Sequence, residues 1–117
     1  MKLHISPAAL QDLKDIKNYI SYTLCNHSAA IRIVKNIITS YLKLADSPFI
    51  GISLRSKVNF DTPYRYIISG SYLVFYQINH ETVEILRVIY ARRDYIKILF
   101  NIDCEKIEES SSENAPE

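Results

Sequence analysis

Glycine is scarce in this chain, with Gly51 and Gly70 as its only two examples. Neither G-x-G-x-x-G nor G-x-x-x-x-G-K-[ST] can therefore be written anywhere in the sequence. Those loops need several glycines because the backbone must come close to phosphate groups. Enzymes that hold a nucleotide cofactor in a loop of either kind are excluded.

Cysteine and histidine are also few. The chain has two cysteines (Cys25 and Cys104) and three histidines (His4, His27 and His80), all far apart in sequence. No pair of them has the short spacing that is typical of structural zinc ligands. We expect reduced thiols and scattered histidines, and neither a metal nor a cofactor.

Long apolar runs are missing too. No stretch approaches the roughly 20 apolar residues of a membrane span. The first residues, Met1 to Pro7, lack the apolar segment of a secretory signal. These absences predict a cytoplasmic protein that does not associate with membranes.

The chain has 117 residues, 48% of them hydrophobic, which is enough for one domain with a core but too little for two. Its net charge of +1 hides an asymmetry. Residues 1–100 hold 13 Lys and Arg against 7 Asp and Glu, whereas residues 101–117 hold one Lys against six acids. We predict a basic domain over 1–100 and an acidic, disordered tail over 101–117.

The first half predicts two amphipathic helices joined by about three residues, which form an antiparallel hairpin. Ser6 and Pro7 begin the first helix as N-cap and first helical residue, and it runs to about Leu24. Ser28 is the expected N-cap of the second. The apolar positions expected to be buried recur every three or four residues and are Leu10, Leu13, Ile16, Ile20, Leu24, Ala30, Val34, Ile37, Ile38, Tyr41 and Leu42.

The rest predicts mainly strands. Alternation at Leu3 and Ile5 indicates an N-terminal strand, and 64–69, 72–78 and 82–90 indicate an antiparallel meander with tight turns. Residues 47–63 predict a loop pinned to the core, with a short strand near Ile52. A short last helix begins at Tyr95, with Asp94 as its cap. The expected fold is α+β, one sheet with a helical hairpin and a short C-terminal helix.

The strand over 82–90 is apolar on both faces, as a central strand would be. Strict alternation places Val83, Ile85 and Ile89 on one face together with Arg87. It places Leu86, Val88 and Tyr90 on the other. A guanidinium among apolar residues must pair, reach solvent or serve a site. Two interpretations stay open for Arg87: a functional role, or an ion pair with Asp61, Glu84 or Asp94.

Arginine and tyrosine gather on the sheet half of the chain. Guanidinium groups bind phosphates bidentately and tyrosine rings stack on bases, so this mixture suits a nucleic acid or a similar target. Ordinary sheet packing also explains the tyrosines, and a solvated turn explains the paired arginines that follow residue 91. The candidate target-binding residues are Arg65, Arg87, Arg92, Arg93 and Lys97.

Four segments, taken in order, resemble the RelE/ParE family of type II toxin–antitoxin toxins. They are Leu3–Leu13, Ser47–Leu54, Tyr64–Tyr76 and Val83–Tyr95, and the resemblance runs from about Lys2 to Phe100. It implies a growth-inhibiting toxin that a cognate antitoxin neutralises in a hetero-oligomer. It also implies one of two targets. RelE-like toxins cut mRNA on the ribosome without a metal, and ParE-like toxins poison DNA gyrase without doing chemistry.

A nuclease of this family would use Arg65 and Arg87 to bind phosphate, Arg92 as a second cation and Tyr95 as proton donor. However, Leu73 stands where ribonuclease members with a Tyr-Arg pair have a catalytic arginine. No residue is a convincing general base, because an ordinary tyrosine is protonated at neutral pH. The sequence therefore favours the ParE-like interpretation. The ribosome-dependent nuclease and a non-toxic binding module stay open as alternatives.

Overall fold

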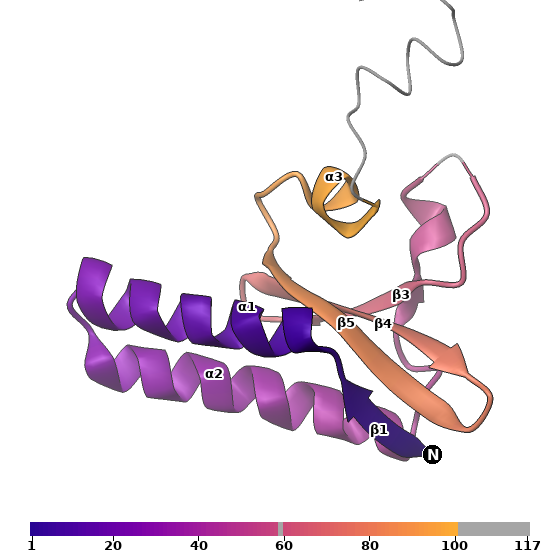
Figure 1. Ribbon diagram of the computed structural model, residues 1–117, viewed down its shortest axis with the longest axis horizontal. Helices are drawn as coiled ribbons and strands as arrows, with labels where there is room; N and C mark the ends of the chain where they lie inside the picture. The colour runs from indigo at the N-terminus through magenta and orange to yellow at the C-terminus, as the bar shows by residue number, and fades with distance from the viewer. Residues whose placement is uncertain (59, 101–117) are drawn as a thin grey trace, which may run out of the picture.

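A helical hairpin and a short C-terminal helix cover opposite faces of one mixed sheet (Figure 1). The computed structural model describes residues 1–58 and 60–100. Its elements are β1 (Lys2–Ile5), α1 (Pro7–Asn18), η1 (Tyr19–Thr23), α2 (His27–Leu42), η2 (Lys43–Ala45), β2 (Ile52–Ser53), η3 (Leu54–Ser56), β3 (Arg65–Ser69), β4 (Tyr72–Asn79), β5 (Thr82–Tyr90) and α3 (Tyr95–Phe100).

The sheet has five strands in the order β1-β5-β4-β3-β2. The predicted meander β3-β4-β5 is confirmed, and β1 joins it parallel to β5, with Lys2 opposite Thr82 and Ile5 opposite Ile85. β2 adds only two residues, at the position near Ile52 where the sequence predicts a short strand. Because β1 lies outside β5, the strand over 82–90 is central, as its apolar residues on both faces indicate.

Helix α1 begins where the sequence predicts. The hydroxyl of Ser6 accepts from the Ala9 N–H at 3.0 Å and donates to the Leu86 carbonyl at 2.8 Å. The second helix begins earlier than predicted, since Asn26, not Ser28, is its N-cap and accepts from the Ala29 N–H at 3.1 Å. Asn is as strong an N-cap as Ser. It comes first after Cys25, whose φ of 54° ends the preceding turn.

The buried side of α1 differs from the predicted apolar stripe. Leu13, and Ile20 in η1, are buried as expected, but Leu10 is 47% exposed. The predictions for Leu24 and Leu42 are wrong too, since these side chains are 55% and 53% exposed. Ala9 and Asp12 face the sheet in place of Leu10, and Ala9 has no exposed surface. The side chain of Ala9 is small, so the helix axis can approach β5 closely. The carboxylate of Asp12 then has specific partners on that strand, described below.

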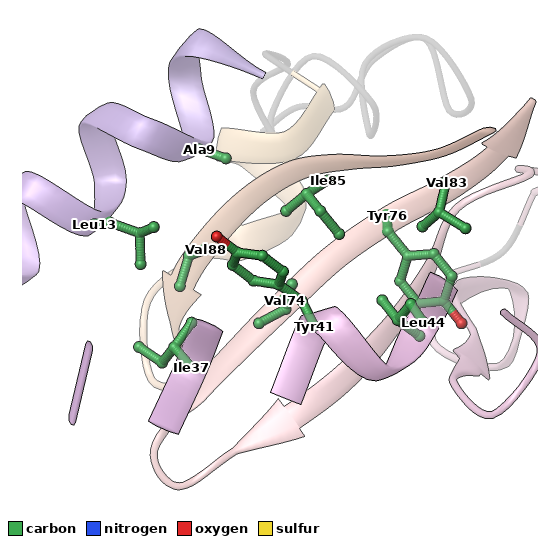
Figure 2. Packing of buried hydrophobic residues seen from close by; sticks show 10 residues of the cluster. All are labelled: Ala9, Leu13, Ile37, Tyr41, Leu44, Val74, Tyr76, Val83, Ile85 and Val88. Carbon is green, nitrogen blue, oxygen red and sulfur yellow. The ribbon is translucent and has the colours of Figure 1, made fainter. Parts of the chain in front are cut away.

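Two apolar clusters lie on the two faces of the sheet. The larger fills the space between hairpin and sheet (Figure 2), where Ile37, Tyr41 and Leu44 pack against strand residues. Those strand residues are Val74, Tyr76, Val83, Ile85 and Val88. The smaller cluster, on the far face, consists of Leu54, Tyr66, Leu73, Phe75 and Ile89, with the apolar residues of α3 packed on it.

A bulge in β5 overturns the strict alternation predicted for that strand. Phe75 pairs with Arg87 and Tyr76 with Ile85, so Leu86 has no partner on β4. One extra residue on a strand reverses the faces that follow it. Val88 consequently joins Val83 and Ile85 under the hairpin, and Ile89 lies on the far face.

The predicted acidic tail, 101–117, lies outside the described residues, and the domain boundary at residue 100 stays a prediction. Within the part that the structure describes, no helix is long and apolar enough to cross a membrane.

Candidate functional site

Arg87 is held by a carboxylate on the first helix. Its Nε and Nη2 donate to the two oxygens of Asp12 at 2.7 and 2.8 Å. The side chain of Asp12 is 11% exposed and that of Arg87 28%. The hydrogen bond to Asp12 raises the pKa of Arg87, and the charges of Asp12 and Asp15 act in the same direction against desolvation. The guanidinium is a fixed cation inside a part-buried bidentate pair.

An ion pair is therefore present, but the predicted partners were wrong. Asp61 pairs with Arg55 at 3.4 Å, Glu84 accepts from the side chain of Gln77, and Asp94 accepts from the N–H of Lys97 at the start of α3. None of these three acids lies on the element that packs against the bulge of β5. That element is α1, and Asp12 is its residue facing β5.

The position of Asp12 follows from the short length of β1. That strand ends at Ile5, so the outer edge of β5 has no strand beyond Ile85. An unpaired N–H at a buried edge must find another acceptor. Asp12 accepts from the Val88 N–H at 2.9 Å in addition to the two bonds from Arg87. One carboxylate thus completes the hydrogen bonding of the strand edge and binds the arginine beside it.

Arg65 on β3 is occupied in a different way. Its Nη2 donates to the carbonyls of Phe49 and Gly51 at 3.2 and 2.7 Å, and the guanidinium lies 5.5 Å from the centroid of the Phe49 ring. Its Nε is buried and has no partner in the described structure. Tyr76 binds the same segment, donating to the Pro48 carbonyl at 2.7 Å and accepting from the Gly51 N–H at 3.1 Å. Together they clamp residues 48–51 to the sheet.

Tyr95, the predicted proton donor, packs on the far face of the sheet against Phe75, the β4 residue that pairs with Arg87. Tyr95 is half-buried, with its ring 5.4 Å from that of Phe75 in the far-face cluster. Leu73 is 8% exposed and belongs to the same cluster. Arg65 and Arg87 occupy strands on either side of β4, about 10 Å apart. Their guanidinium groups bind different segments, that of Arg65 residues 48–51 and that of Arg87 the first helix α1.

Arg92, Arg93 and Lys97 are exposed and follow β5 at one end of the sheet. We call them the basic end of β5. His80 lies in the turn at the opposite end of β5, a strand about 30 Å long. The basic end therefore offers three cations to a ligand, and His80 lies far from it. In residues 1–58 and 60–100, no three His, Cys, Asp or Glu side chains are placed to hold a metal ion.

Sequence reasoning missed Asp12 and Tyr76. Asp12 lies one turn before Ile16, between Ala9 and Leu13, so a helix wheel centred on Ala9 would have placed it toward the core. In the sequence, Tyr76 is indistinguishable from an ordinary strand tyrosine. Gly51, one of only two glycines in the chain, was the available signal that another group comes close to the backbone there. A Cβ at this position would collide with the Tyr76 hydroxyl.

Comparison with known proteins agrees with this architecture. The model of a family described as the ParE toxin of the type II toxin–antitoxin system parDE matches residues 3–95. The chain belongs to the ParE toxin family. This confirms the resemblance to the RelE/ParE family, and the ParE-like interpretation is consistent with the family name.

A solved structure described as the chromosomal ParDE toxin–antitoxin system from P. aeruginosa has a similar fold. The TM-score is 0.67 at 19% sequence identity, over 79% of this chain and 97% of that one. Among curated proteins, none matches the sequence.

As a ParE family member, the chain is the toxin component of a toxin–antitoxin module, and its partner is an antitoxin. The match includes Arg92 and Arg93 and ends at Tyr95.

Proposed function

We propose that this ParE toxin arrests growth by binding DNA gyrase through the basic end of β5, without catalysing a reaction itself. The observation that supports this most directly is the engagement of the nuclease candidates. Arg65 binds carbonyl groups of residues 48–51, Arg87 is paired with Asp12, and Tyr95 packs in the far-face cluster. Arg92, Arg93 and Lys97 are the cations at this end of the sheet that are exposed to solvent.

The chemistry of RNA cleavage supplies the second argument. Metal-independent attack by a 2′-hydroxyl needs a proton acceptor and a cation at the phosphate. At the basic end of β5 a cation is available, but the residue in the position of the catalytic arginine is the buried Leu73. Arginine is over-represented among the residues that contribute most binding energy in protein–protein interfaces. A protein target therefore explains the exposed arginines as well as a nucleic acid does. Gyrase acts in the cytoplasm, so this proposal also places the toxin there, in a hetero-oligomer with its antitoxin.

The decisive experiment compares two assays on the purified chain. We expect inhibition of supercoiling by purified gyrase, and no cleavage of mRNA in a reconstituted translation reaction. Replacing both Arg92 and Arg93 by Ala should weaken gyrase inhibition at least about tenfold.

The matched control replaces Arg32 and Lys35, two exposed cations on α2, and should inhibit like the parent. Cleaved mRNA with active gyrase would overturn the proposal in favour of the nuclease. Normal growth on induction, with soluble protein present, would indicate a non-toxic binding module.

A further inference from the structure

The helical hairpin is longer than the sheet it covers. In Figure 1 its tip, where α1 continues through η1 and turns into α2, lies beyond the end of the sheet. The apolar side of the hairpin continues into this overhang, where Leu24 is 55% and Tyr19 54% exposed. A cleft of about 660 Å³ lies between the overhang and the end of the sheet. We call it the hairpin cleft.

The walls of the hairpin cleft combine apolar side chains with three tyrosines. Ile16, Ile20 and Ile33 contribute from the hairpin. Tyr19 comes from the hairpin, and Tyr72 and Tyr90 come from β4 and β5, with their ring centroids 5.7 Å apart. Burial raises the pKa of Tyr72, and the nearby hydroxyls of Tyr90 and Tyr19 raise it further. The raised pKa keeps the Tyr72 phenol neutral at physiological pH, in the same cleft as the rings of Tyr19 and Tyr90.

The lining of the cleft is less basic than the domain as a whole. It has two aspartates, Asp12 and Asp15, against one arginine, Arg93, whereas residues 1–100 carry a net charge of +6. Asp12 is saturated by Arg87 and the Val88 N–H. Asp15 is exposed, and its Oδ1 accepts a hydrogen bond from the Gln11 side chain at 2.9 Å. Asp15 is therefore the acid that faces an incoming group.

Aromatic faces beside a carboxylate attract a cation. A guanidinium or ammonium over tyrosine rings gains about 0.5–2 kcal/mol in general, more when water is excluded. An apolar wall next to such a place suits the aliphatic stem of the same side chain or a neighbouring leucine. We propose that the hairpin cleft receives a lysine or arginine side chain, flanked by a bulky aliphatic residue, from the antitoxin. Tyr19, Tyr72, Tyr90 and Asp15 recognise its charge.

The position of the cleft also connects it with the target surface. Arg93 belongs both to its lining and to the basic end of β5. A segment seated in the cleft would cover Arg93 and so exclude the target from part of that surface. This inference rests on the proposed function for the identity of the partner, but its test does not involve toxicity, so the two can fail separately.

The experiment titrates the whole chain with three probes and follows the backbone and tyrosine ring signals by NMR. The probes are acetyl-leucyl-arginine amide, its neutral isostere acetyl-leucyl-citrulline amide, and acetyl-leucyl-glutamate amide. We expect the arginine probe to shift the signals of Tyr19, Tyr72 and Tyr90 and to bind about tenfold more tightly than the citrulline probe.

Two variants and a control sharpen this test. Asp15→Asn should reduce the preference for arginine to about twofold and leave citrulline binding as it was, and Tyr90→Leu should weaken the arginine probe. Asp46→Asn, which changes an exposed acid outside the cleft, should behave like the parent. Equal binding of arginine and citrulline, preference for glutamate, or no shifts in the cleft at millimolar probe would each overturn the proposal.

Discussion

Two pairs of arginines in this toxin differ in what their charge does. Arg65 and Arg87 lie within strands and have fixed acceptors, carbonyl oxygens for the one and the Asp12 carboxylate for the other. Arg92 and Arg93 lie in the turn after β5 and are exposed. The guanidinium group is the same in all four, so residue type alone does not separate arginines that stabilise the fold from those that are available to a target. Position relative to unsatisfied backbone groups does.

The sequence predicts which faces of the helices and strands are buried, but not which acceptor each arginine binds. Hydrophobic periodicity predicts the hairpin and the meander, because it reports which faces are buried. It cannot report a bulge, so the prediction of which face each residue of β5 after Leu86 occupies is wrong. It also cannot report a carbonyl as an acceptor, which hides the role of Arg65. The Asp12 partner of Arg87 is 75 residues away in sequence, and only the packing of α1 on β5 brings them together.

The largest loss of stability is expected when Arg87 loses the carboxylate of Asp12. Asp12→Ala leaves the Arg87 guanidinium and the Val88 N–H without their acceptor in a part-buried place, which should lower the free energy of unfolding by about 3 kcal/mol. Urea denaturation followed by circular dichroism measures it. Asp46→Ala, at an exposed site, should stay within about 0.5 kcal/mol of the parent. A loss no larger than in this control would place Arg87 with the free arginines.

The next largest loss of stability is expected in residues 48–51, the segment that Arg65 binds. In Gly51→Ala the new methyl group would meet the Tyr76 hydroxyl and lie 2.8 Å from the Tyr66 carbonyl. The loop must then shift, at a cost of about 2 kcal/mol. Gly70 has open space but a φ of 60°, so Gly70→Ala should cost about 1 kcal/mol through backbone strain alone. Thermal unfolding of both variants checks the order, and the reverse order would contradict the clamp.

Arg65 itself should stabilise the protein without contributing to target binding. Arg65→Ala removes two hydrogen bonds to carbonyls and should cost about 1.5 kcal/mol, with gyrase inhibition unchanged under conditions where the variant is folded. Arg65→Lys keeps the charge but not the planar fork, so it should lose part of the same stability. If Arg65→Ala inhibited gyrase less while unfolding like the parent, Arg65 would belong to the target surface.

Alkaline pH should reduce the stability that the buried Tyr41 provides but leave the ion pair of Arg87 and Asp12 intact. Burial raises the pKa of Tyr41 above its ordinary value near 10. The unfolded chain then loses the tyrosine proton first, so stability is complete below about pH 10 and declines as pH rises further. The hydrogen bond to Asp12 raises the pKa of Arg87, so that pair stays ionised there.

We therefore expect Tyr41→Phe to show a smaller decline of the unfolding free energy between about pH 10 and pH 11 than the parent. The exposed Tyr22 supplies the control, and Tyr22→Phe should decline like the parent. An unchanged decline in Tyr41→Phe would assign it to other groups.

The smallest change in stability is expected at the free arginines. Arg92 and Arg93 are exposed in the turn after β5, so replacing both by Ala should alter the unfolding free energy by no more than about 0.5 kcal/mol. The same double variant should lose gyrase inhibition, and the parent's inhibition should weaken with added salt, which screens exposed charges over about 10 Å at 0.1 M. A stability loss comparable to that of Asp12→Ala would show that these arginines, too, maintain the fold, and the contrast between the two pairs would disappear.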